Sequence, residues 1–326
     1  MKRFLYLGLL LTGLLSLVVF FISLYQSLRL YIFAPEQGST LIYHFSLYIP
    51  DNRNSFFDGI IRGAEQAAAE LNSAISLHSI DPAKNELEVA PFTGVDGVIV
   101  CPYLDDALAR RQLEKLKKQN LPVVLINHNL PSDQPWPFIG INNFDLGRRI
   151  GIALSESAEN IQLAMVYSDK APGIYTEREL VEMGISAALG KRLSGPIMSY
   201  RTNLNPLDAE SLLMRIFRNQ GIRIGNPDSA DGPAINTIVF TDPEDTIAAA
   251  QTLVDMNLVG LIQIVGFGED PGVIENLRKG IVSASVVINS ERIGYEAVHS
   301  LAALRTTSYT SASIDTGIEI IKGSGQ

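Results

Sequence analysis

From residue 39 onward, short apolar runs alternate with amphipathic helical patterns along most of the chain. The runs, for example PVVLIN at 122–127, are almost continuously apolar, as expected of strands covered on both faces. Between two runs, Phe57, Ile60, Ala64 and Ala68 recur at helical spacing. The alternation predicts an α/β fold with parallel sheets and right-handed crossovers. Strand-like runs lie at 41–48, 75–80, 96–101, 122–127, 138–142, 161–167, 236–240, 262–267, 281–288 and 314–321.

A second constraint is the apolar run at residues 4–25, which contains no charged residue. A helix of this length crosses a hydrocarbon core of about 30 Å. Lys2 and Arg3 precede it, which predicts a cytoplasmic N-terminus and an extracytoplasmic remainder, in a periplasm or at a cell surface. A cleaved signal peptide is the alternative, but bulky residues stand where a small-x-small cleavage site is expected. We therefore expect a single-pass membrane anchor.

The composition excludes several function classes. The formal net charge is −9, which argues against a nucleic-acid backbone as the main partner. A single cysteine, Cys101, excludes a disulfide framework and cysteine-based metal sites. The four histidines show no zinc-binding spacing, and neither a P-loop nor a G-x-S-x-G motif occurs. We predict no catalytic residue, no bound metal and no cofactor, and hence a protein that is not an enzyme.

Seven motifs occur in a characteristic order along the chain. They are NSFFDGIIRGAEQAAAEL (54–71), GVDGVIVCP (94–102), LPVVLINHNL (121–130), FIGINNFDLGRRIG (138–151), VFTDPEDTIAAAQTL (239–253), VGFGEDP (265–271) and LRKGIVSASVVINSERIGYEAV (277–298). Together they resemble the type I periplasmic sugar-binding proteins, such as the ribose-binding protein, over about residues 41–321. The ligand-binding domains of lac-repressor-type regulators share that fold, but here an apolar run occupies the place of their DNA-binding helices.

The resemblance implies two Rossmann-like lobes, joined by a three-segment hinge and separated by a ligand cleft. Crossings are then expected near Asn142, near Ile288–Asn289 and near residues 307–311. Residues 1–38 become a cytoplasmic tip, anchor and tether. The N-terminal lobe comprises 39–141 with 289–308, and the C-terminal lobe comprises 142–288 with 309–326.

In the first lobe, the resemblance implies ligand contacts from Asn54, Phe56 and Phe57, which open the first helix. Aromatic rings stack on sugar rings, and amides serve hydroxyl groups as donor and acceptor. Asn54 is equally suited to cap the helix, and Phe57 to pack in the core. Asn127 and His128 stand where ribose-type sequences carry Asp-Arg, so they keep hydrogen bonding but lose fixed charge.

Around the hinge and in the second lobe, the resemblance implies contacts from Asn142, Arg178 and Asp242. The family's sugar-binding Asp is replaced here by Gly268, which leaves Glu269 or Asp270 to substitute. Its hinge Gln is replaced by Ile288, with Asn289 beside it. Because unpaired hydroxyl groups cost about 1–3 kcal/mol each, ribose itself is not expected as the ligand.

The sequence therefore predicts an extracytoplasmic solute-binding protein that captures a small polar ligand, with a sugar favoured, for an ABC importer. The alternative is a membrane-tethered sensor subunit that signals to a histidine kinase or another receptor. A purely structural protein that no longer binds ligand is a third possibility, because two second-lobe contacts are missing or displaced.

Overall fold

A computed structural model describes the residues from Gly13 to Gly323 except 26–41, 52–53, 81–85, 103–105, 131–134, 157, 206 and 220–234. The chain divides into two compact units, Met1–Ile42 and Tyr43–Gln326. In the first unit, residues 13–25 form a helix. No helix within the described ranges is both long and apolar enough to cross a membrane. The expected span at 4–25 begins on residues 4–12, which lie outside the described residues.

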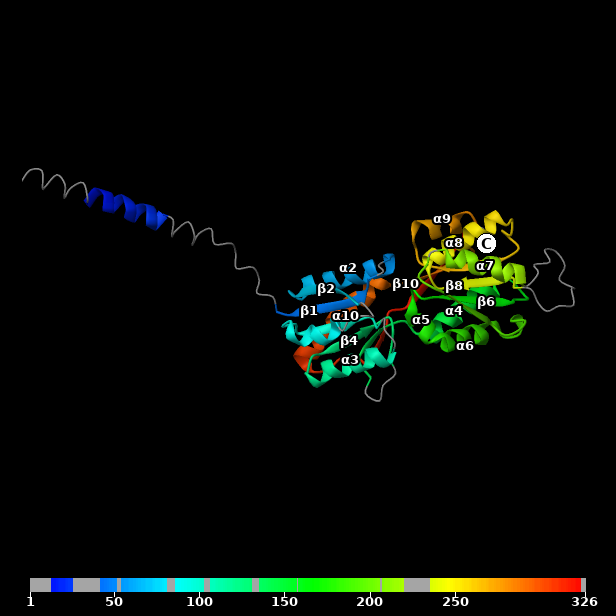
Figure 1. Cartoon of the computed structure of the whole chain (residues 1–326), viewed down its shortest axis with the longest axis horizontal. Coiled ribbons are helices and arrows are strands. Elements are labelled where there is room, and N and C mark those ends of the chain that lie inside the picture. The colour runs from blue at the N-terminus through cyan, green and yellow to red at the C-terminus, as the bar shows by residue number, and fades with distance from the viewer. Residues whose placement is uncertain are drawn as a thin grey trace, which may run out of the picture. The chain divides into compact units, whose positions relative to one another are not determined.

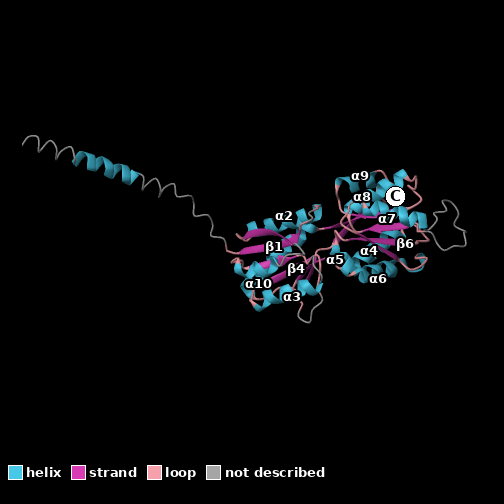
Figure 2. Ribbon diagram, in the orientation of Figure 1, coloured by secondary structure: helices cyan, strands magenta, loops and turns pink. Residues whose placement is uncertain are grey.

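The second unit contains two six-stranded sheets, drawn in magenta in Figure 2. The first sheet has the order β11-β5-β4-β3-β1-β2 and is parallel throughout. Its strands are β1 (His44–Pro50), β2 (Ala74–Ile80), β3 (Gly97–Val100), β4 (Val123–Ile126), β5 (Phe138–Gly140) and β11 (Ser313–Asp315).

The second sheet has the order β12-β10-β9-β8-β6-β7, and only β12 runs antiparallel to its neighbour. The predicted two-sheet α/β fold is confirmed by this arrangement. Its strands are β6 (Leu163–Ser168), β7 (Met198–Thr202), β8 (Thr237–Phe240), β9 (Gln263–Phe267), β10 (Ala284–Ile288) and β12 (Ile318–Lys322).

Helices cover both faces of each sheet (Figure 1). We call each sheet with its packed helices a lobe. The first lobe contains α2 (Ser55–Glu70), α3 (Asp106–Lys118), α10 (Ser290–Thr307) and the 3₁₀ helix η1 (Glu86–Phe92). The second contains α4 (Asn143–Ser155), α5 (Pro172–Thr176), α6 (Arg178–Leu189), η2 (Gly190–Arg192), α7 (Asp208–Asn219), α8 (Pro243–Asp255) and α9 (Pro271–Arg278).

The continuously apolar strands follow from this two-sided covering. In β6, Leu163, Met165 and Tyr167 join the core beneath α4 and α6, whereas Ala164 and Val166 join the core beneath α7 and α8. Successive strand residues point to opposite faces, so a strand buried on both sides has no polar face to present. The apolar runs of the sequence are thus explained by two cores per sheet.

The chain passes between the sheets at three places. It leaves the first sheet after β5, returns after β10, and crosses again between β11 and β12. The third crossing corrects our expectation, because residues 314–321 do not form one strand. Gly317 has a φ of +76°, and its amide donates to the Asp315 carboxylate at 2.9 Å, so the run bends there. β11 consequently belongs to the first lobe, whereas the sequence predicts residues 309–326 in the second.

Candidate functional site

A cleft of about 650 Å³ lies where the carboxyl ends of the two sheets face each other. In parallel α/β sheets this edge gathers the loops that follow the strands, and ligands bind there. Loops and helix starts of both lobes contribute to its lining. The lining includes Asn54, Phe56, Phe57 and Asn127 from the first lobe, and Lys170, Ile174, Asp242, Phe267, Glu269 and Ile318 from the second, with Asn289 at a crossing.

Four of the expected polar contacts are helix N-caps. The side-chain oxygens of Asn54, Asn142, Asp242 and Asn289 accept from backbone amides three residues later, at 3.0–3.3 Å. Capping satisfies amides that would otherwise lack a partner at a helix start. For the three caps that line the cleft, the same bond fixes the side chain at the cleft edge.

The aromatic side of the cleft comes from the start of α2. Phe57 is 1% exposed and packs in the first-lobe core, and it also contributes to the lining of the cleft. Phe56 is half-buried, with its ring edge-on to Phe57 at a centroid distance of 5.3 Å. A ring held this way offers a rigid apolar surface to a ligand.

Three expected contacts lie outside the residues that line the cleft. His128 is 3% exposed and packed inside the first lobe. Asn142 is exposed and caps α4. Arg178 begins α6, and its guanidinium lies 4.9 Å from the centre of the Tyr175 ring. The structure therefore brings together seven of the ten residues expected from sequence.

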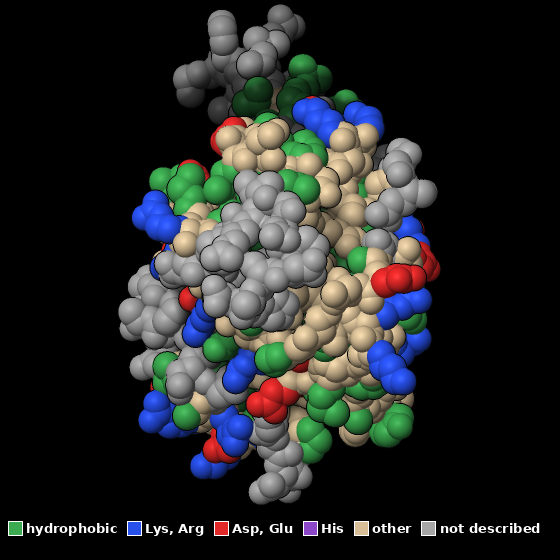
Figure 3. All heavy atoms as spheres, turned by 90° about the vertical axis from the view of Figure 1, so that its right-hand side faces the viewer, with side chains coloured by type: hydrophobic (Ala, Val, Ile, Leu, Met, Phe, Trp, Pro, Cys, Tyr) green, Lys and Arg blue, Asp and Glu red, His purple; other side chains and the backbone are tan. Residues whose placement is uncertain are grey.

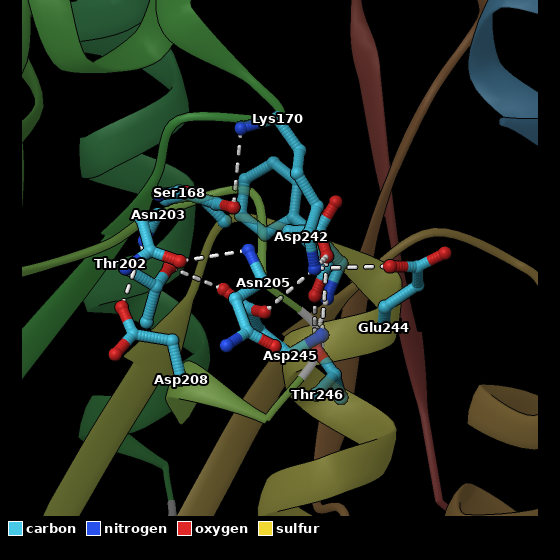
Figure 4. A network of polar contacts seen from close by, with 12 residues as sticks. Ser168, Lys170, Thr202, Asn203, Asn205, Asp208, Asp242, Glu244, Asp245 and Thr246 are labelled. Carbon is cyan, nitrogen blue, oxygen red and sulfur yellow. Dashed lines mark hydrogen bonds and ion pairs between the residues drawn. The ribbon is translucent and has the colours of Figure 1, made fainter. Parts of the chain in front are cut away.

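A buried ionic network in the second lobe was missed by sequence reasoning. The Lys170 ammonium lies 3.0 Å from Asp245, 2.9 Å from Glu244 and 3.5 Å from Asp242, as Figure 4 shows. The side chains of Lys170, Asp242 and Asp245 are almost fully buried, whereas Glu244 is 58% exposed. Thr202 also donates to Asp245. Lys170 and Asp242 form part of the cleft lining.

The network perturbs the pKa of both groups that face the cleft. Burial lowers the pKa of Lys170, but attraction to Asp242 and the contacts with Glu244 and Asp245 outweigh it and raise the pKa above its ordinary value. Burial and repulsion by Asp245 raise the pKa of Asp242 to about 6, although Lys170 acts in the opposite direction. At neutral pH, Lys170 is charged and Asp242 is mostly ionised.

The lobes touch beside the cleft. The Ser55 hydroxyl at the start of α2 donates to the Asp270 carboxylate of the second lobe at 3.0 Å. The backbone of Gly173 in α5 lies so close to Asn127 that an added Cβ would be 2.3 Å from the Asn127 carbonyl oxygen. The cleft is therefore bordered by contacts between lobes, and a larger residue than glycine would separate them.

Residues 45–307 match the sequence model of a family described as periplasmic binding protein domain. The chain belongs to this family. The match includes both sheets except β1's first residue, β11 and β12. No curated protein sequence matches the chain significantly.

Solved structures of binding proteins share the fold. GanP, a glucose-galactose binding protein from Geobacillus stearothermophilus, aligns with a TM-score of 0.74 and 21% identity over 87% of this chain and 98% of its own. The myo-inositol binding protein from Caulobacter, bound to myo-inositol, aligns with a TM-score of 0.71 and 18% identity over 86% and 93%. A solute-binding protein from Actinobacillus succinogenes with bound D-allose aligns with a TM-score of 0.72 and 17% identity, over 86% of this chain and 98% of its own.

Proposed function

We propose that this protein captures a small polyhydroxylated solute, a sugar or a sugar-like molecule, in the cleft between its lobes. The observation that supports this proposal most directly is the cleft, whose volume of about 650 Å³ falls within the range of small-molecule binding sites. Its lining combines the half-buried Phe56 ring with the amides of Asn54, Asn127 and Asn289. The D-allose and the myo-inositol bound in two structural neighbours support the same ligand class.

The chemistry of the lining suits such a ligand. One face of a sugar ring carries C–H groups that pack on an aromatic ring, and its edge carries hydroxyl groups. An N-capping Asn uses its side-chain oxygen for the cap, so its amide N–H groups remain suited to donate to a hydroxyl oxygen. Asp242 accepts from hydroxyl groups, which provides the opposite polarity.

A thermal-shift screen tests this proposal. The full chain in detergent is heated with pentoses, hexoses, cyclitols, amino sugars, nucleosides and amino acids. A solute that binds only the folded state raises its stability by about 2.7 kcal/mol at a hundredfold excess over Kd. We expect at least one polyhydroxylated solute to raise the unfolding temperature. Stabilisation by amino acids or nucleosides alone would contradict the proposal.

The capture step serves delivery to an ABC importer. The alternative partner is the extracytoplasmic part of a membrane sensor kinase, favoured by the apolar run at residues 4–25, which would hold the binding domain beside a membrane partner. Crosslinking in native membranes separates the two. Ligand-dependent crosslinks to a permease support import, whereas crosslinks to a kinase support sensing.

The same run supports our proposal of a retained single-pass anchor with the binding domain outside the cytoplasm. Mass spectrometry of the membrane-extracted protein tests it. An intact N-terminal segment is expected, and a mature N-terminus between residues 23 and 39 would contradict it.

A further inference from the structure

Among the described residues that line the cleft, carboxylates outnumber cationic groups. The cationic groups are Arg62 and Lys170. The carboxylates come from both lobes, so the described part of the lining contributes a negative potential to the cleft at neutral pH. The lining carboxylates are Asp58, Asp242, Glu269, Glu291 and Glu319.

Both cations are already engaged by carboxylates of the protein. Arg62 pairs with Glu291 at 2.8 Å. Lys170 is surrounded by the three carboxylates of the second-lobe network described above. By contrast, Asp58, Glu269 and Glu319 form no ion pair with any other described residue. A ligand therefore meets three exposed carboxylates that no described residue pairs with.

The deepest part of this negative potential is buried. Asp242 and Asp245 are each 1% exposed, and the single ammonium of Lys170 is their shared counter-charge. Two buried carboxylates beside one ammonium leave an excess negative charge, and Asp242 is the one of the two that belongs to the cleft lining. Away from water such a charge interacts strongly with a ligand, because little solvent screens it.

The outer end of the second lobe differs from the cleft. Figure 3 shows basic, acidic and apolar side chains interspersed on that face. Mixed charges of this kind produce little net field.

We infer that the solute held in this cleft carries a positive charge, as an amino sugar or another amine-bearing polyol does. The inference deepens the proposed sugar-binding function and rests on it. An ammonium group beside Asp242 forms a charge-assisted hydrogen bond and compensates the buried excess charge. A uronate or a sugar phosphate meets like charges on both walls and is rejected.

A matched set of hexoses tests the sign of the charge. 6-Amino-6-deoxyglucose, glucose and glucuronate differ at carbon 6 alone, and glucosamine and galactosamine place the amine at carbon 2. Titration calorimetry on the full chain at about pH 7 measures each Kd. We expect an amino hexose to bind about tenfold or more tightly than its neutral counterpart. The preference should shrink between about 25 and 250 mM salt.

Spermidine in the same titrations separates this inference from the sugar proposal. If neutral hexoses or glucuronate bind as tightly as every amino hexose, the inference is overturned and the sugar-binding proposal is retained. Binding of spermidine without any hexose overturns the sugar proposal and supports a cation site. Binding of no member of the set overturns the inference, and the wider thermal-shift screen then decides the sugar proposal.

Asp242→Asn identifies the residue responsible. Asn is as good an N-cap as Asp, so α8 keeps its start while the buried excess charge disappears. The matched control is Glu159→Gln, which removes one exposed charge before the opposite end of β6. We expect the amine preference to fall severalfold in Asp242→Asn, which keeps Asp58, Glu269 and Glu319, and to persist in Glu159→Gln. An unchanged preference in Asp242→Asn would overturn the assignment.

Discussion

At the level of single residues, helix capping explains why polar side chains gather at the cleft. Asn54, Asp242 and Asn289 each begin a helix that follows a strand, and each also lines the cleft. The sequence left cap and ligand contact as alternatives for Asn54. The structure shows that the cap is formed, and the same geometry keeps the side chain at the site.

Lys170 shows the limit of reading residues one at a time. It stands in an unremarkable loop after β6, and its partners follow β8. Lys170 and its acidic partners each follow a strand, and β6 and β8 are adjacent parallel strands, so the residues after them lie close together. The pairing could have been predicted only with the strand order, and the sequence alone does not show which strands are neighbours.

The raised pKa of Asp242 gives a pH dependence of stability. A carboxyl whose pKa is higher in the folded state stabilises the fold below its unfolded pKa and loses that contribution as pH rises through about 6. Lys170, Glu244 and Asp245 face this group. Wild type should therefore lose about 1–2 kcal/mol of unfolding free energy relative to Asp242→Asn between about pH 4 and 7.

Denaturant unfolding of both proteins across this pH range measures the difference. A constant gap between the two curves would show that Asp242 titrates in the folded state as it does in the unfolded chain. Glu159→Gln serves as control, since it removes one exposed carboxylate that lies outside the buried network.

At the level of elements, sequence predicted the buried strands and missed those that depend on context. β7 could not be predicted from an apolar run. It lies at the edge of its sheet, where burial alternates along the strand, so its sequence is not continuously apolar. The sequence predicts one strand at 314–321 because the residues of β11 and β12 both favour strands. Gly317 between them marks the bend that separates the two. The alternating helices and central strands were predictable because burial on both faces dictates their composition.

Close packing of α2 against α10 depends on glycine. A Cβ at Gly63 would lie 1.8 Å from the carbonyl oxygen of Glu291, and one at Gly294 would lie 1.9 Å from that of Ile60. The contact matters because α10 directly follows the crossing at Asn289. It ties the returning chain to the first lobe.

Gly63→Ala should therefore destabilise the protein by about 1–3 kcal/mol, although Gly-to-Ala changes usually stabilise a helix interior. The control is Glu65→Ala on the exposed side of α2, which should change stability by less than about 0.5 kcal/mol. Chemical unfolding measures both. A Gly63→Ala protein as stable as wild type would mean that the two helices can move apart without cost.

At the level of the whole molecule, the three crossings allow the lobes to rotate about one edge of the cleft. The contacts from Ser55 to Asp270 and from Asn127 to Gly173 bring the lobes together beside it. A ligand that touches both lobes favours a closed form over an open one by its differential affinity for the closed form. Cleft closure is therefore the expected response to binding.

Spin labels report this closure. Glu114→Cys on α3 and Arg215→Cys on α7 place one exposed label on each lobe, and the native Cys101 is buried. Pulsed electron paramagnetic resonance should show a shorter and narrower distance distribution once a binding solute is present. An unchanged distribution, with binding confirmed by calorimetry, would indicate that the ligand enters lobes that are already closed.

The most direct test of the account is calorimetry on one cleft variant from each lobe with a solute found to bind. Phe56→Ala removes the aromatic surface of the first lobe, and Asp242→Asn removes the buried charge of the second. Each should weaken binding by about 1–3 kcal/mol, while Lys117→Ala on the exposed side of α3 leaves it unchanged. Wild-type affinity in both cleft variants would contradict capture between the lobes.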